Sequence, residues 1–223
     1  MNSLTINKET LGYQGGFLAL VTAVATALLL GVNWLSVDTI TLRQREDQLA
    51  GLNQVLPTRM YQNDILQSLH AITENQKNYL VFIGKDLTEA VTGYAIQGTT
   101  TGYAGDITFL VGLDANANIL GVRILAHAET PGLGDKIEIA KSNWVENFKQ
   151  RSLKNTVATQ WAVKKDGGMF DQFTGATITP RAVVKGVHEA LINVPLEKVL
   201  MLATVEASDK LTSEPQHAGA KHE

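Results

Sequence analysis

The sequence predicts an α+β protein, in which a single N-terminal transmembrane helix is followed by one α+β domain with a largely antiparallel sheet. Three observations support this fold class. A long uncharged apolar stretch lies near the amino terminus, short β-like runs separated by turn residues follow, and a well-marked amphipathic helical pattern comes after them. The 223 residues are enough for one domain with its own core and some additional elements.

Composition excludes several classes of protein and site. The formal net charge is −3 and no basic cluster stands out, which argues against a nucleic-acid partner. The chain has no cysteine, which excludes disulfides, thiolate zinc sites and thiolate-ligated iron–sulfur clusters. The histidines show no paired ligand spacing, so no metal site is predicted.

The apolar stretch predicts a retained membrane anchor over residues 11–37, preceded by an N-terminal cytoplasmic segment over residues 1–10. No charged residue lies between Glu9 and Asp38. As a helix rising ~1.5 Å per residue, residues 17–35 would extend ~28 Å, about the thickness of the bilayer hydrocarbon. A cleaved signal peptide is the alternative, but the run is longer than the usual ~7–15 apolar residues and no clean cleavage site follows it. Lysine and arginine are nearly balanced on its two sides, so charge does not orient it.

Residues 38–78 are expected to form a juxtamembrane helical segment. A helix is predicted over residues 39–56 and should end at Pro57, because proline cannot continue the backbone hydrogen-bond ladder. The pattern over residues 61–77 is ambiguous, and a short helix over residues 63–70 is the interpretation it favours.

Residues 79–207 are expected to form the folded domain, and its first part reads as strands. Runs typical of β-strands cover residues 79–83, 89–96, 107–113 and 119–125. The last two flank an Asp/Asn-rich turn over residues 114–118, which predicts a β-hairpin and therefore an antiparallel sheet.

The part of the domain after the hairpin is expected to alternate between loops, helices and one strand. A turn-rich loop over residues 130–134 should lead into a helix, since Asp135 and Glu138 have capping-box spacing and apolar residues, among them Trp144, recur with helical period. A strand is predicted over residues 156–163, a last helix over residues 196–207 and a disordered polar tail over residues 208–223. Trp144 and Trp161 are expected in the core.

A helix start at Thr179 and Pro180 is the local feature most suited to binding an anion. Thr179 has the side chain of an N-cap and Pro180 suits the first helical position, while residues 181–193 carry an apolar stripe that leaves His188 and Glu189 in solvent. The first N–H groups of a helix lack internal acceptors, so a phosphate would be stabilised there. A helix start with an upstream turn and no ligand is the simpler interpretation of this pattern alone.

The string before that helix adds a specific motif, Asp171-x-x-Thr174-Gly175-Ala176-Thr177. It resembles the D-x-x-[ST]-G-A-T flavinylation sequence at every defined position. In that sequence a dedicated flavin transferase joins FMN to the last threonine through a phosphodiester bond, which here implies Thr177. The small residues Gly175 and Ala176 leave room for the phosphate. Thr174 stands where the family often has serine.

A second segment, His127-x-Glu129-Thr130-Pro-Gly132-Leu133-Gly134, looks like another recurrent part of the same FMN-binding domain. Without that resemblance it is equally well an ordinary turn between a strand and a helix. A bound FMN needs a second surface for its ring, and the 130–134 loop is our candidate for it. We expect its amides to hydrogen-bond the flavin and Leu133 to touch the ring, and we interpret Glu129 as structural or as a flavin contact. The implied cofactor-binding residues are Thr177, Asp171, Thr174, Gly175, Ala176, Thr179, Glu129, Thr130, Gly132, Leu133 and Gly134.

With the hairpin and the single N-terminal span, these segments resemble the G subunits of the Rnf/Rsx ion-translocating electron-transport complex over residues 10–207. The related C subunit of the sodium-pumping NADH:quinone oxidoreductase is similarly organised. The resemblance implies a single-pass protein of the bacterial inner membrane with covalent FMN on the periplasmic side. It would relay electrons among the other membrane and redox subunits of a ferredoxin/NAD-linked complex that moves Na⁺ or H⁺, without catalytic residues of its own.

Two other functions remain open from the residues themselves. The chain could be a membrane-tethered redox sensor or regulator that binds FMN, although only a short tail remains for an output module. It could also be an anchored binding protein for another phosphate-bearing ligand, with Thr177 unmodified.

Overall fold

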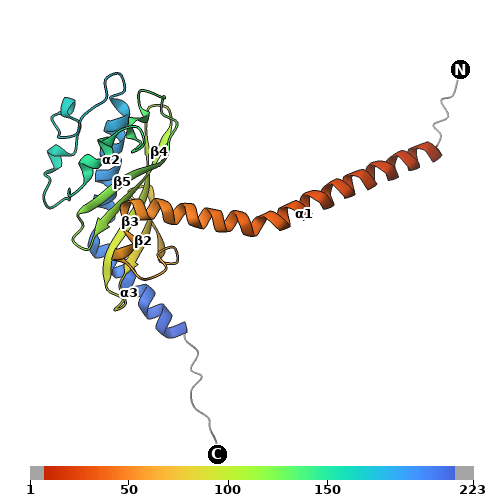
Figure 1. Ribbon diagram of the computed structural model, residues 1–223, viewed down its shortest axis with the longest axis horizontal. Helices are drawn as coiled ribbons and strands as arrows, with labels where there is room; N and C mark the ends of the chain where they lie inside the picture. The colour runs from red at the N-terminus through yellow and green to blue at the C-terminus, as the bar shows by residue number, and fades with distance from the viewer. Residues whose placement is uncertain (1–7, 214–223) are drawn as a thin grey trace, which may run out of the picture. The chain divides into compact units, whose positions relative to one another are not determined.

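The computed structural model describes residues 8–213, in two compact units that divide between Gln48 and Leu49. Residues 1–7 of the expected cytoplasmic segment and residues 214–223 of the expected tail lie outside the described part of the chain. Figure 1 traces the elements from the first helix, α1, to the last, α3.

Helix α1 runs without interruption from Lys8 to Val55, so it passes through the expected boundary between a membrane helix and a separate juxtamembrane helix. Within it, the 18 residues Gln14–Gly31 have a mean hydropathy of 1.7, which makes the helix long and apolar enough to cross a membrane. Its last turns, from Leu49, belong to the second unit. The expected stop at Pro57 is confirmed, since the helix ends two residues earlier.

The second unit is built on a five-stranded sheet in which each strand pairs with the next in antiparallel fashion. The strands are β1 (Leu69–Glu74), β2 (Lys77–Lys85), β3 (Val91–Thr101), β4 (Asp106–Asp114) and β5 (Ile119–Ala126). The predicted antiparallel sheet and the β4–β5 hairpin are confirmed. Asp114 fixes the hairpin turn because its Oδ1 accepts the amide N–H groups of Asn116 and Asn118, both at 2.8 Å.

The helix predicted over residues 63–70 is wrong, because this segment pairs with the sheet. The Asn63 side chain donates to the carbonyl of Ile83 at 2.9 Å and accepts the N–H of Lys85 at 2.8 Å. β1 then begins at Leu69 and pairs with β2, with His70 opposite Val81. These contacts satisfy the polar groups of the strand edge, which a local helix would leave unpaired.

One face of the sheet is covered by α2 (Ile178–Asn193), which packs on β3 and β4, and by α3 (Leu196–Ser213), which contacts β2 and β3 (Figure 1). Side chains at alternate positions along the strands, such as Tyr94 and Ile96, form the apolar core on this face together with Val183 and Val187 of α2. Contrary to the predicted tail, residues 208–213 continue α3.

The other face of the sheet is covered by the end of α1. Leu52, Val55 and Leu56 form a second apolar cluster with strand residues that include Phe82 and Leu110. The backbone of Val55 comes so close to β4 that a Cβ placed on Gly112 would lie 2.1 Å from the Val55 carbonyl oxygen. The end of α1 is therefore an integral part of the domain core.

Residues 135–170 contain turns and 3₁₀ helices, so the α-helix from Asp135 and the strand over residues 156–163 were wrong predictions. The 3₁₀ helices are Asp135–Ile137, Asn143–Phe148, Ala158–Gln160 and Lys164–Asp166. The aromatic side chains of this segment do not line one face of a helix. They form an aromatic cluster of Trp144, Phe148, Trp161 and Phe170, in which the ring centroids of Phe148 and Phe170 are 4.4 Å apart. The predicted core positions of Trp144 and Trp161 are confirmed, since each is 5% exposed.

Candidate functional site

A pocket of about 520 Å³ lies where the start of α2 meets the loops that follow β3 and β5. It brings together the two sequence segments expected to form the site, although residues 135–170 of the chain lie between them. Its lining residues are Tyr103, Glu129, Thr130, Leu133, Gly134, Gly175, Ala176, Thr177, Ile178 and Thr179.

The Gly-Ala step before Thr177 forms a tight turn. The amide N–H of Ala176 donates to the carbonyl of Phe173 at 3.2 Å, and Gly175 adopts a φ of +82°, a conformation that favours glycine. Phe173 holds the turn in place because its ring packs edge-on against Trp144, with the two ring centroids 5.3 Å apart. The turn brings the half-buried Thr177 to the pocket.

Helix α2 begins earlier than predicted, and Thr179 is not its cap. The first helical residue is Ile178, the N-cap position is Thr177, and Thr177 makes no side-chain capping hydrogen bond. Pro180 is therefore the third helical residue and contributes no N–H. The first N–H groups of an α-helix have no helical carbonyl four residues before them to accept their hydrogen bonds. The N–H groups of Ile178 and Thr179 are therefore the two donors left at the anion-binding end of α2.

The Thr179 hydroxyl, which was expected to cap the helix, instead donates a hydrogen bond to the Glu129 carboxylate. Glu129 is 4% exposed. Its other oxygen accepts the backbone N–H groups of Tyr103 at 2.8 Å and Ala104 at 3.1 Å. The buried carboxylate thus joins three segments around the pocket and is surrounded by donors, as a buried charge requires.

Two glycines make room for this carboxylate. A Cβ on Gly102 would lie 2.3 Å from Glu129 Oε1, and one on Gly134 would lie 2.9 Å from Glu129 Oε2. On the same loop, the Glu129 N–H donates to His127 Nδ1 at 3.0 Å, and His127 Nε2 lies 2.8 Å from Glu138 Oε1. Gly134 therefore makes room for the Glu129 carboxylate and also lines the pocket.

Three expected site residues do not line the pocket. Asp171 is exposed and forms an ion pair with Lys164 at 2.5 Å, while its carbonyl accepts the indole N–H of Trp144 at 2.7 Å. Thr174 is exposed in the turn before Gly175. Gly132 is exposed with a φ of +78°, so it shapes the loop turn without reaching the pocket.

Two lining residues, Tyr103 and Ile178, were missed. Ile178 lies between Thr177 and Thr179, so contiguity alone could have included it. Tyr103 follows Gly102 in the loop between β3 and β4, far from either motif. A glycine-bounded loop with an aromatic residue was the one available signal for it.

His188 and Glu189 of α2 do not lie free in solvent as predicted. The His188 ring stacks on Trp161, with centroids 5.1 Å apart and planes 5° from parallel. Burial lowers the pKa of His188, and the neighbouring Glu189 charge opposes that shift. Glu189 forms an ion pair with Lys77 at 2.5 Å. These contacts pin the outer face of α2 to the aromatic cluster and to the sheet.

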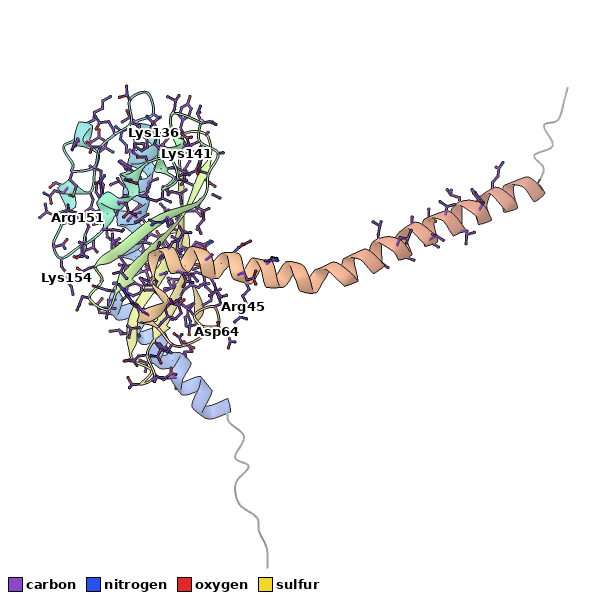
Figure 2. The ribbon with its side chains drawn as sticks, viewed as in Figure 1. Arg45, Asp64, Lys136, Lys141, Arg151 and Lys154 are labelled. Carbon is purple, nitrogen blue, oxygen red and sulfur yellow. The ribbon has the colours of Figure 1, made fainter. Side chains whose placement is uncertain are left out.

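Basic side chains lie on the segments next to the pocket but do not line it. Arg181, at the start of α2, forms a two-point ion pair with Asp166, at 2.6 and 2.9 Å, which lowers the pKa of Asp166. Lys136 and Lys141 are exposed on the segment that follows Gly134 (Figure 2). Within residues 8–213, no lysine or arginine lines the pocket.

The pocket fits a ligand with a phosphate end and a large planar ring. Its volume of about 520 Å³ is that of a typical small-molecule site. One part offers the Thr177 hydroxyl and the unpaired amides of the helix start, and another offers the apolar surfaces of Leu133, Ala176 and Ile178. The residues present therefore suit a flavin mononucleotide.

Two family models match parts of this chain, and a solved structure is similar to it. The model of the FMN-binding domain family matches residues 102–192, and the model of the RnfG N-terminal region matches residues 1–55. Among solved structures, the C subunit of the Na⁺-translocating NADH-quinone reductase from Parabacteroides distasonis is similar with a TM-score of 0.40 and 22% identity, over 64% of this chain and 68% of that one.

Curated relatives match most of the chain. The G subunit of the ion-translocating oxidoreductase complex from Stutzerimonas stutzeri is 48% identical over 82% of this chain and 81% of its own length. The protein of the same name from Escherichia coli K12 is 42% identical over 82% of this chain and 90% of its own length. The chain therefore belongs to the family of G subunits of ion-translocating oxidoreductase complexes.

Proposed function

We propose that this protein is a membrane-anchored electron-transfer subunit that carries FMN in a phosphodiester bond to Thr177. The observation that carries the proposal is the position of Thr177, which lines a pocket of about 520 Å³ at the first turn of α2 without a side-chain capping bond. FMN, when bound, accepts and releases electrons. The chain positions it and would relay electrons within an ion-translocating complex.

A covalent link suits this pocket better than a freely exchanging FMN. A free phosphate monoester carries a charge of roughly −1.5 to −2 at pH 7 and is usually met by arginine or lysine. In the described part of the chain no such side chain lines the pocket, and the Glu129 carboxylate lies in its wall. A phosphodiester carries a single negative charge, which the two free N–H groups at the start of α2 can stabilise.

The remaining motif residues divide by their position. Thr130, Leu133, Gly134, Gly175, Ala176 and Thr179 line the pocket with Glu129 and would surround the flavin or hold its neighbours in place. Asp171 and Thr174 are exposed beside it, so they are available to the flavin transferase during maturation. Gly132 would act through the conformation of the 130–134 loop.

The apolar part of α1 supports a single membrane span, and the names of the relatives support assembly with other subunits of an ion-translocating complex. We infer a bacterial inner-membrane protein with the FMN domain in the periplasm. A reporter fused after Glu223 should be active only in its periplasmic form, and α1 should keep the chain in the membrane pellet after alkaline extraction. A cytoplasmically active reporter or a soluble chain would contradict this topology.

Flavin fluorescence after denaturing electrophoresis tests the covalent link. In a host that contains the flavin transferase, the wild-type band should fluoresce, Thr177→Ala should not, and Thr174→Ser should remain fluorescent because either residue satisfies the motif. A non-fluorescent wild-type band, or a fluorescent Thr177→Ala band, would contradict the proposal.

A further inference from the structure

Tyr103 combines a fixed backbone with an unburied ring. Its amide N–H is held by Glu129 Oε1 at 2.8 Å, and the next amide, that of Ala104, binds the same oxygen at 3.1 Å. The turn is closed by a hydrogen bond of 2.8 Å from the Gly102 N–H to the Gly105 carbonyl. Nevertheless, Tyr103 is 68% exposed.

The turn that carries Tyr103 cannot easily move away from the pocket. Glu129 is buried and also accepts the Thr179 hydroxyl, so one carboxylate fastens the turn to the first residues of α2. A Cβ on Gly102 would meet Glu129 Oε1 at 2.3 Å and Ile107 Cδ1 at 2.7 Å, which shows how closely the turn is packed. Tyr103 is therefore presented at the pocket on the same support as Thr177.

An exposed aromatic ring on such a support indicates a binding surface. Tyrosine side chains usually bury ~150–250 Å² of surface, and leaving one exposed forgoes that stabilisation. Among the residues that the structure describes, Tyr103 is also the only aromatic residue in the pocket lining. The other apolar side chains there, Leu133, Ala176 and Ile178, are aliphatic. A planar aromatic ligand gains most by stacking on a ring, in the offset or edge-on geometries that aromatic pairs prefer.

We propose that Tyr103 stacks against the flavin ring of the group attached at Thr177 and shields that ring from solvent. The proposal rests on the proposed function and extends it by naming the residue that positions the ring. The phosphate end is fixed by α2, and the ring end would be fixed by the β3–β4 turn. An electron-rich phenol against the flavin would favour the electron-poor oxidised ring, and it would quench flavin fluorescence by donating an electron to the excited ring.

Time-resolved flavin fluorescence of the full-length, covalently loaded protein tests this proposal. Tyr103→Leu should lengthen the emission lifetime severalfold and change the visible circular dichroism of the flavin bands, because the quencher and the stacked ring are both lost. Tyr103→Trp should keep the emission short-lived. Tyr103→Phe should lengthen the lifetime while it retains the visible circular dichroism, because phenylalanine stacks but is a poor electron donor.

Tyr61→Phe provides the matched control. The Tyr61 hydroxyl donates to Asn53 Oδ1 at 2.8 Å, and Tyr61 packs against the apolar cluster that contains Leu52 and Leu56. Removing this hydroxyl should leave flavin emission unchanged. If the wild type carries covalent flavin and Tyr103→Leu alters neither lifetime nor circular dichroism, the role of Tyr103 is overturned and the proposed function stands. If the wild type carries no covalent flavin, both are overturned.

Discussion

The hydroxyl of Thr179 donates a hydrogen bond to the buried carboxylate of Glu129, 50 residues earlier in the chain. Thr179 lies two residues after Thr177, and Glu129 also holds the turn that carries Tyr103. One side chain thus sets the relative positions of the residue proposed to carry the phosphate and the residue proposed to face the ring. The site is organised around Glu129, although Glu129 need not touch the flavin.

Replacing Glu129 by alanine should therefore destabilise the domain. It leaves three donors, the N–H groups of Tyr103 and Ala104 and the buried Thr179 hydroxyl, without their acceptor. We expect a loss of about 2–4 kcal/mol in the free energy of unfolding, measured by urea denaturation of the full chain. Glu197→Ala, at the start of α3, should change it by less than about 0.5 kcal/mol. Equal effects of the two variants would contradict the role of Glu129.

Two paired glycines test the packing of α1 on the sheet. Gly112 of β4 and Gly121 of β5 lie opposite each other, but an added Cβ would lie 2.1 Å from the Val55 carbonyl oxygen at Gly112 and no closer than 3.6 Å to any neighbour at Gly121. Gly112→Ala should cost about 3 kcal/mol because the end of α1 must shift. Gly121→Ala should lie within about 0.5 kcal/mol of wild type. Comparable urea midpoints for both variants would show that α1 does not pack there.

His188 should make the stability of the domain depend on pH. Burial against Trp161 lowers the pKa of His188 in the folded state, so the unfolded chain binds a proton first as the pH falls. This contribution is fully present above the unfolded pKa of about 6.5 and decreases as the pH falls from there towards the lower folded pKa. His188→Phe keeps a ring on Trp161 and should remove this part of the decrease, as measured by urea unfolding between pH 8 and pH 5. An unchanged pH slope would exclude His188 as its source.

The parts of the fold that the sequence predicts well are those set by local patterns. Alternating apolar residues and the Asp/Asn turn at 114–118 place β2 to β5, and an apolar stripe places α2. β1 was missed because its edge position leaves Leu69 and Thr73 exposed, which weakens the alternation. In the 135–163 segment, apolar residues at helical spacing predict a helix. These residues lie on successive 3₁₀ turns and form an aromatic cluster with Phe170, which lies outside the segment that shows this periodicity.

The residues of the site also fall into those that local sequence patterns predict and those that only the folded chain brings together. The motif strings identify eight of the ten lining residues, because their small residues and hydroxyls have local signatures. Thr179 was assigned to the helix cap because a Thr-Pro pair favours that role, yet its hydroxyl bonds to Glu129. Tyr103 comes from a third segment, which only the folded sheet brings to the pocket. Such long-range pairings carry no signal in the neighbouring sequence.

The most direct test of the central claim is to locate the flavin on the chain by tandem mass spectrometry. Cleavage after Lys165 and Arg181 releases residues 166–181, a peptide that contains Thr174, Thr177 and Thr179. We expect a mass increase of one FMN less one water, with fragment ions that place it on Thr177. Thr179 should be unmodified because its hydroxyl is buried against Glu129. An unmodified peptide from protein made with the transferase, or FMN on Thr174 or Thr179, would contradict it.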